Sequence, residues 1–105
     1  MPWMVASCTP CLQSLYIDEC RLTDDDIPLL ISILAAGRGL WRLNVCGNKF
    51  SLSMIDTLTA GLKKYSNITC LHIRDVGLDA DHVKEVVRRN LPQMKETEVG
   101  VFSTD

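Results

Sequence analysis

The chain has 105 residues and a mass of 11.7 kDa, the size of a single domain. Hydrophobic residues make up 47% and charged residues 23%, a balance that excludes wholesale disorder. The net charge of −2 supplies no basic stripe for nucleic-acid phosphates and no polybasic patch for a membrane surface.

The first 11 residues precede the periodic part of the chain. They lack a positively charged start and contain Pro2 and Pro10, so we expect no cleaved signal peptide. The five cysteines are therefore expected to be reduced thiols, as in a cytoplasmic or nuclear protein. No apolar run approaches the roughly 18–20 residues needed to cross a bilayer, which predicts no membrane partner.

Three consecutive segments share one pattern at a spacing of 28 residues. Each begins with two apolar residues at alternate positions, which predicts a short strand with one buried face. These pairs are Leu15 and Ile17, Leu43 and Val45, and Leu71 and Ile73. Each segment continues with apolar residues at helical spacing. The helical sets are Ile27, Leu30, Ile31 and Leu34, then Ile55, Leu58 and Leu62, then Val83, Val86 and Val87.

Capping residues mark where the three helices begin and end. The expected starts are Thr23 with Asp26 three residues on, Ser51, and Asp79. The expected ends are Gly37 with Gly39, residues 65–67, and Pro92. Such strand–helix units bury their apolar faces only by stacking on one another.

The units divide one domain, residues 1–105, into a partial N-terminal unit (1–11), three repeats (12–39, 40–67 and 68–95) and a truncated C-terminal unit (96–105). In the truncated unit, Val99 and Val101 occupy the positions of the buried strand residues. We therefore expect one more short strand in the same arrangement.

The repeats follow the pattern L-x-x-L-x-L-x-x-(N/C)-x-L, with Cys20 and Asn48 at the polar position and Val76 replacing it in the third. This pattern resembles the ribonuclease-inhibitor type of leucine-rich repeat, found also in NOD-like receptors. The resemblance implies an α/β fold: a right-handed solenoid, or horseshoe segment, with a short parallel sheet on the concave face and helices on the convex face. It also implies that the polar side chain hydrogen-bonds the turn backbone, which Val76 cannot do.

The strand residues that alternate with the buried ones are expected to face outward on the concave surface. Their mixture of polar, aromatic and arginine side chains predicts a surface for a protein partner. The predicted partner-binding residues are Tyr16, Asp18, Arg42, Asn44, Cys46, His72, Arg74, Glu98 and Phe102. The predicted function is that of a non-enzymatic protein–protein interaction module or scaffold, either the C-terminal part or a small relative of a larger leucine-rich-repeat protein.

The N-terminal edge predicts a second contact. The first strand has no neighbour before it, and exposed edge strands pair readily with other chains. We expect self-association, or docking of further repeats, through residues 1–17.

Cys8 and Cys11 form a C-x-x-C pair, which leaves a thiol-redox or metal-binding protein as the alternative function. The next segment is predicted to be a strand rather than the helix that lowers a thiol pKa, and no second ligand pair supports zinc. Asp24, Asp25 and Asp26 lack the ligand spacing of a calcium loop. No nucleophile motif is present, so we expect neither enzymatic activity, nor a cofactor, nor a metal site.

Overall fold

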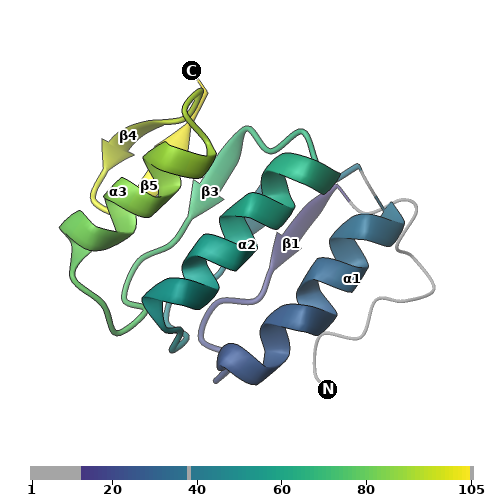
Figure 1. Cartoon of the computed structure of the whole chain (residues 1–105), viewed down its shortest axis with the longest axis horizontal. Coiled ribbons are helices and arrows are strands. Elements are labelled where there is room, and N and C mark those ends of the chain that lie inside the picture. The colour runs from purple at the N-terminus through teal and green to yellow at the C-terminus, as the bar shows by residue number, and fades with distance from the viewer. Residues whose placement is uncertain (1–12, 38, 105) are drawn as a thin grey trace.

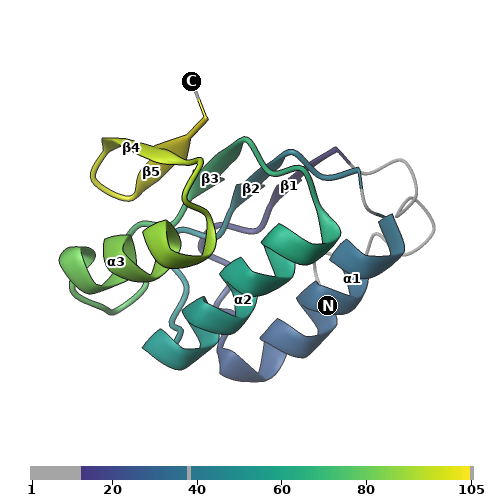
Figure 2. The same cartoon turned by 45° about the horizontal axis from the view of Figure 1, so that its top comes forward.

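A computed structural model describes residues 13–37 and 39–104. Three helices pack on one face of a five-stranded sheet, so the fold has two layers (Figure 1, Figure 2). The strands are β1 (Ser14–Tyr16), β2 (Arg42–Asn44), β3 (Cys70–His72), β4 (Lys95–Glu98) and β5 (Val101–Ser103). The helices are α1 (Ile27–Gly37), α2 (Leu52–Tyr65) and α3 (Ala80–Asn90), with the 3₁₀ turn η2 (Asp24–Asp26) leading into α1.

The first three strands lie parallel and in the register that their sequence spacing predicts. Ser14 lies opposite Arg42, and Arg42 lies opposite Cys70. The central residue of each of these strands is a leucine buried under the helices: Leu15, Leu43 and Leu71. Leu43, on the middle strand of the three, is fully enclosed. The predicted positions of these three strands and of the three helices are confirmed.

The predicted helix starts are also confirmed. The backbone N–H of Thr23 donates to Asp26 Oδ2 at 2.9 Å, as in a capping box. Ser51 Oγ accepts from the N–H of Met54 at 3.3 Å, and Asp79 Oδ1 accepts from the N–H of Asp81 at 2.8 Å.

The predicted right-handed solenoid is wrong, because residues 95–103 reverse direction. The sheet order is β1-β2-β3-β5-β4, and β5 pairs antiparallel with both β3 and β4. The molecule is a small α/β domain with a mixed sheet, not a uniformly parallel horseshoe. A parallel neighbour needs a crossover of a dozen or more residues, whereas only Val99 and Gly100 separate β4 from β5. Such a short connection forms a hairpin.

The register of the hairpin exchanges the predicted inward and outward positions of the last strand. Phe102 lies opposite Leu71 and is 2% exposed, so it belongs to the core rather than to the predicted outer surface. Val101 lies opposite His72 on the outer face, and Val99 is 63% exposed in the turn. Alternating apolar residues predict a strand but not its register, so the predicted inward positions of Val99 and Val101 and the predicted exposure of Phe102 are wrong.

No helix within residues 13–37 and 39–104 combines the length and the apolar character needed to cross a membrane.

Candidate functional site

The sheet face opposite the helices carries two rows of side chains that cross the strands. Residues directly opposite one another in a sheet share a face, so the pairing register defines each row. The first row is Ser14, Arg42, Cys70, Ser103 and Lys95. The second row is Tyr16, Asn44, His72, Val101 and Glu98. Within the described residues no helix covers this surface, which we call the open sheet face (Figure 2).

Arg42 lies between Ser14 and Cys70 in the first row and is held by its neighbours. Its Nη1 donates to the Tyr16 hydroxyl at 2.7 Å, and its guanidinium lies 5.2 Å from the centre of the Trp41 ring. Hydrogen bonds to Cys70 and, to a smaller extent, to Tyr16 raise the pKa of Arg42 above its ordinary value. The open sheet face therefore carries a permanent positive charge flanked by two aromatic rings, Tyr16 at 54% and Trp41 at 40% exposure.

Arg74 organises the end of the open sheet face nearest the hairpin turn. Its Nε donates to the carbonyl oxygen of Val99 at 3.1 Å, and its Nη2 lies 3.7 Å from Glu98 Oε2. The backbone N–H of Arg74 donates to the Cys46 sulfur at 3.2 Å. Burial raises the pKa of the Cys46 thiol, so this sulfur is protonated at neutral pH and is a poor nucleophile.

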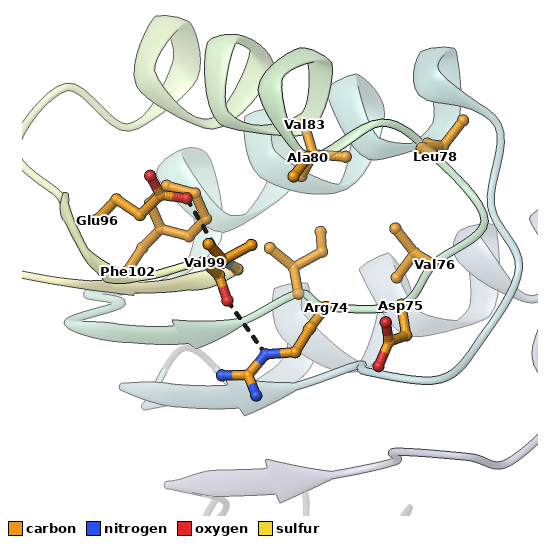
Figure 3. Close-up of a pocket in the computed structure, with 11 residues that line it drawn as sticks. Arg74, Asp75, Val76, Leu78, Ala80, Val83, Glu96, Val99 and Phe102 are labelled. Carbon is orange, nitrogen blue, oxygen red and sulfur yellow. Dashed lines mark hydrogen bonds between the residues drawn. The ribbon is translucent and has the colours of Figure 1, made fainter.

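A cavity of about 120 Å³ lies between the end of β3, the start of α3 and the β4–β5 turn (Figure 3). Most of its wall is apolar and includes Val76, Val83 and Phe102, whereas Arg74 and Glu96 lie at its edge. Glu96 Oε2 accepts from the N–H of Gly100 at 3.3 Å, which closes the turn. The lining contains no serine, cysteine or histidine, and its charged residues are Arg74, Asp75 and Glu96.

The structure brings some of the predicted partner-binding residues together and separates others. Tyr16 contacts Arg42, and Arg74 contacts Glu98, whereas Phe102 is buried. Asn44 turns its amide oxygen to the N–H of Cys46 at 3.0 Å. The remaining outward residues are the exposed Asp18 and the half-buried His72 and Cys46.

Sequence reasoning missed Lys95, which belongs to the open sheet face, and Trp41, which lies beside it. Trp41 directly precedes β2, outside the alternating positions used for the prediction. The position of Lys95 depends on the hairpin, which alternation alone does not indicate. For Trp41, the only indication in the sequence was that an aromatic residue directly precedes Arg42.

The thiols of Cys20, Cys46 and Cys70 are free. Within residues 13–37 and 39–104 no group of three His, Cys, Asp or Glu side chains is placed to hold a metal ion. Cys8 and Cys11, together with most of the predicted N-terminal contact, lie outside the described residues.

Comparisons of the chain with protein-family models, curated proteins and solved structures found no match. The structure alone therefore gives the class of fold. It is a mixed α/β domain with helices on one side of the sheet and polar and aromatic side chains on the other. The resemblance to leucine-rich repeats stays a prediction.

Proposed function

We propose that the chain is a non-enzymatic protein-binding module whose open sheet face contacts the partner. The observation that supports this most strongly is the contact of Arg42 with two exposed aromatic residues, Tyr16 on the paired strand β1 and Trp41 directly before β2. Tyrosine, tryptophan and arginine are the residue types that contribute most binding energy at protein interfaces.

The strands beneath this group rest on buried side chains. Leu15, Leu43 and Leu71 pack side by side under the sheet and are buried. A partner that contacts Tyr16 or Arg42 therefore meets side chains whose backbone does not need to be ordered on binding, which lowers the entropic cost of association.

The size of the open sheet face limits the proposal. Strands of three residues are about 10 Å long, and five strands span about 20 Å, which is roughly 200 Å². A standard interface buries about 800 Å² on each partner. The partner must therefore reach beyond the strands, to Trp41 on one side and to the turns at Glu19 and Asp75 on the other.

The sequence resemblance to leucine-rich repeats adds support by analogy, because that family includes nuclease inhibitors and innate-immune receptors that bind proteins. Fold and function are separable, so this support is weaker than the residues of the open sheet face.

Photo-crosslinking from opposite faces tests the proposal. A benzophenone amino acid replaces Tyr16 on the open sheet face in one protein, and Leu29 on α1 in the matched control, since both positions are exposed. We expect a discrete crosslinked protein only from position 16, and we expect Trp41→Ala to weaken its formation. Crosslinking of equal yield from both positions, or from position 29 alone, contradicts the proposal.

A further inference from the structure

We propose that the open sheet face recognises an acidic segment of the partner, with Arg42 binding one carboxylate and Lys95 a second. This inference rests on the proposed function and names the chemistry of the partner.

Among the described residues, neither Arg42 nor Lys95 forms an ion pair. The ion pairs are Arg74–Glu98, Lys84–Glu96 and Arg89–Asp56. Neither Arg42 nor Lys95 takes part in one, and no carboxylate belongs to their row of the sheet. Among the residues outside the described ranges, Asp105 alone is acidic.

Arg42 is positioned for this role before a ligand arrives. A guanidinium carries five N–H donors; in Arg42 one of them is taken by the Tyr16 hydroxyl at 2.7 Å, and the side chain also hydrogen-bonds Cys70. The Nε atom is buried and has no hydrogen-bond partner, so a ligand meets the terminal nitrogens. A carboxylate that accepts from them forms charge-assisted hydrogen bonds, the strongest class in proteins.

The sheet geometry sets the spacing of the two carboxylates. Arg42 on β2 and Lys95 on β4 are separated by three strand intervals, because β3 and β5 lie between them. Three intervals of about 4.8 Å give about 14 Å, which an extended peptide covers in about four residues. The surface therefore fits an extended segment that crosses the strands with two acidic residues about four positions apart.

A protein segment fits this surface better than a nucleic acid. Nucleic-acid affinity grows with the number of phosphates that Lys and Arg neutralise, and this row offers two cations on a chain of net charge −2. Trp41 and Tyr16 supply apolar contact beside the charge, as at protein interfaces.

Peptide binding by fluorescence anisotropy tests the inference on the full chain. The probe is a labelled Gly/Ser peptide with two aspartates about four positions apart, and the matched probe has asparagine at both positions. We expect binding of the aspartate peptide alone, weakened by an increase in salt from about 50 to about 200 mM. Arg42→Gln should weaken it about tenfold and Lys95→Gln less, because the ammonium is less constrained.

Two variants separate recognition from folding. Lys63→Gln removes an exposed lysine of α2, on the helix side, and should leave binding unchanged. Arg42→Lys keeps the charge and loses the planar fork, so its affinity should lie between those of the original chain and Arg42→Gln. The unfolding midpoints of all variants show that each remains folded.

The inference is overturned if the aspartate peptide does not bind, if the asparagine peptide binds equally well, or if Lys63→Gln weakens binding as much as Arg42→Gln. Tighter, Arg42-dependent binding of a single-stranded oligothymidylate would overturn it in favour of a nucleic acid. If crosslinking from position 16 persists unchanged with Arg42→Gln, the acidic partner is wrong although the protein-binding function stands. Loss of face-specific crosslinking refutes the function itself.

Discussion

The turns that follow β2 and β3 occupy equivalent places in the chain, but only the first contains a buried amide. Asn48 is fully buried, and its Oδ1 accepts from the N–H groups of Cys20 at 3.1 Å and Leu22 at 2.9 Å. Its Nδ2 donates to the carbonyl oxygens of Ile17 and Val45, both at 2.9 Å. Val76, at the equivalent position 28 residues later, is also buried but offers only apolar atoms.

Both turns are joined to a neighbouring turn by backbone bonds, and only the first adds a buried amide. Asn48 joins its own turn to the turn after β1, in addition to the backbone bonds from the N–H of Glu19 to Cys46 O at 2.8 Å and from the N–H of Lys49 to Leu22 O at 3.0 Å. The turn around Val76 is joined to its neighbour by backbone bonds, from the N–H of Gly47 to Arg74 O at 2.9 Å and from the N–H of Phe50 to Val76 O at 3.3 Å. The cavity beside the hairpin is lined by Val76. A buried polar residue thus fixes one turn, whereas apolar packing leaves space at the other.

Replacement of Asn48 should have the largest effect on stability. Asn48→Ala leaves buried backbone donors and acceptors without partners, and each such group costs about 1–3 kcal/mol. We expect the free energy of unfolding to fall by at least about 3 kcal/mol, a large part of the total for a small domain. Urea denaturation measures it, and a loss below about 1 kcal/mol would show that the amide does not hold the two turns together.

The glycines near the second turn give a matched pair. A Cβ at Gly100 would lie 2.9 Å from Arg74 Cβ and 3.1 Å from Ile73 O, whereas a Cβ at Gly77 would meet nothing within 4 Å. Both residues have positive φ, +78° and +81°, so alanine costs about 1–2 kcal/mol at either position. We expect Gly100→Ala to lower the free energy of unfolding by about 1 kcal/mol more than Gly77→Ala, because of the added contact. Equal losses would mean that the hairpin can move away from β3.

Val76→Ala should cost less than Asn48→Ala. It removes two buried methyl groups, worth about 1.6 kcal/mol, and leaves no polar group without a partner. The same urea titration measures the difference between the two turns. A loss equal to that of Asn48→Ala would show that the buried amide contributes no more than apolar packing does.

A half-exposed polar cluster on the helix side should give the smallest effect. Hydrogen bonds from Asn90 at 2.7 Å and Arg89 at 3.1 Å lower the pKa of Asp56 below its ordinary value. The resulting stabilisation is present above the unfolded pKa of about 3.9 and is lost as the pH falls through the lower folded pKa.

Thermal unfolding at several pH values checks this effect. We expect the melting temperature of the original chain to fall more steeply below about pH 4 than that of Asp56→Asn. Identical slopes for the two proteins would show that Asp56 gains nothing from its two neighbours.

Local chemistry made part of this structure predictable. Helix starts at Thr23, Ser51 and Asp79 follow from side chains that satisfy nearby backbone N–H groups, so they are visible in the sequence. The candidate site was only partly predictable. Tyr16 and Arg42 face outward as alternation predicts, but their mutual hydrogen bond joins residues 26 positions apart and depends on the strand register.

The sequence by itself determined the spacing of the three strand–helix units and the inward position of Leu15, Leu43 and Leu71, because periodicity and capping act over a few residues. Only the tertiary structure decided the direction of the last strand. A pattern of alternating apolar residues looks the same whether the strand runs parallel or antiparallel to its neighbour. The direction of β5 depends instead on the close approach of Gly100 to Arg74 and on the pairing of β5 with β3. In the observed register Phe102 lies opposite Leu71 and is buried, and Lys95 lies opposite Ser103 in the row of Arg42, because the pairing register decides which residues share a face.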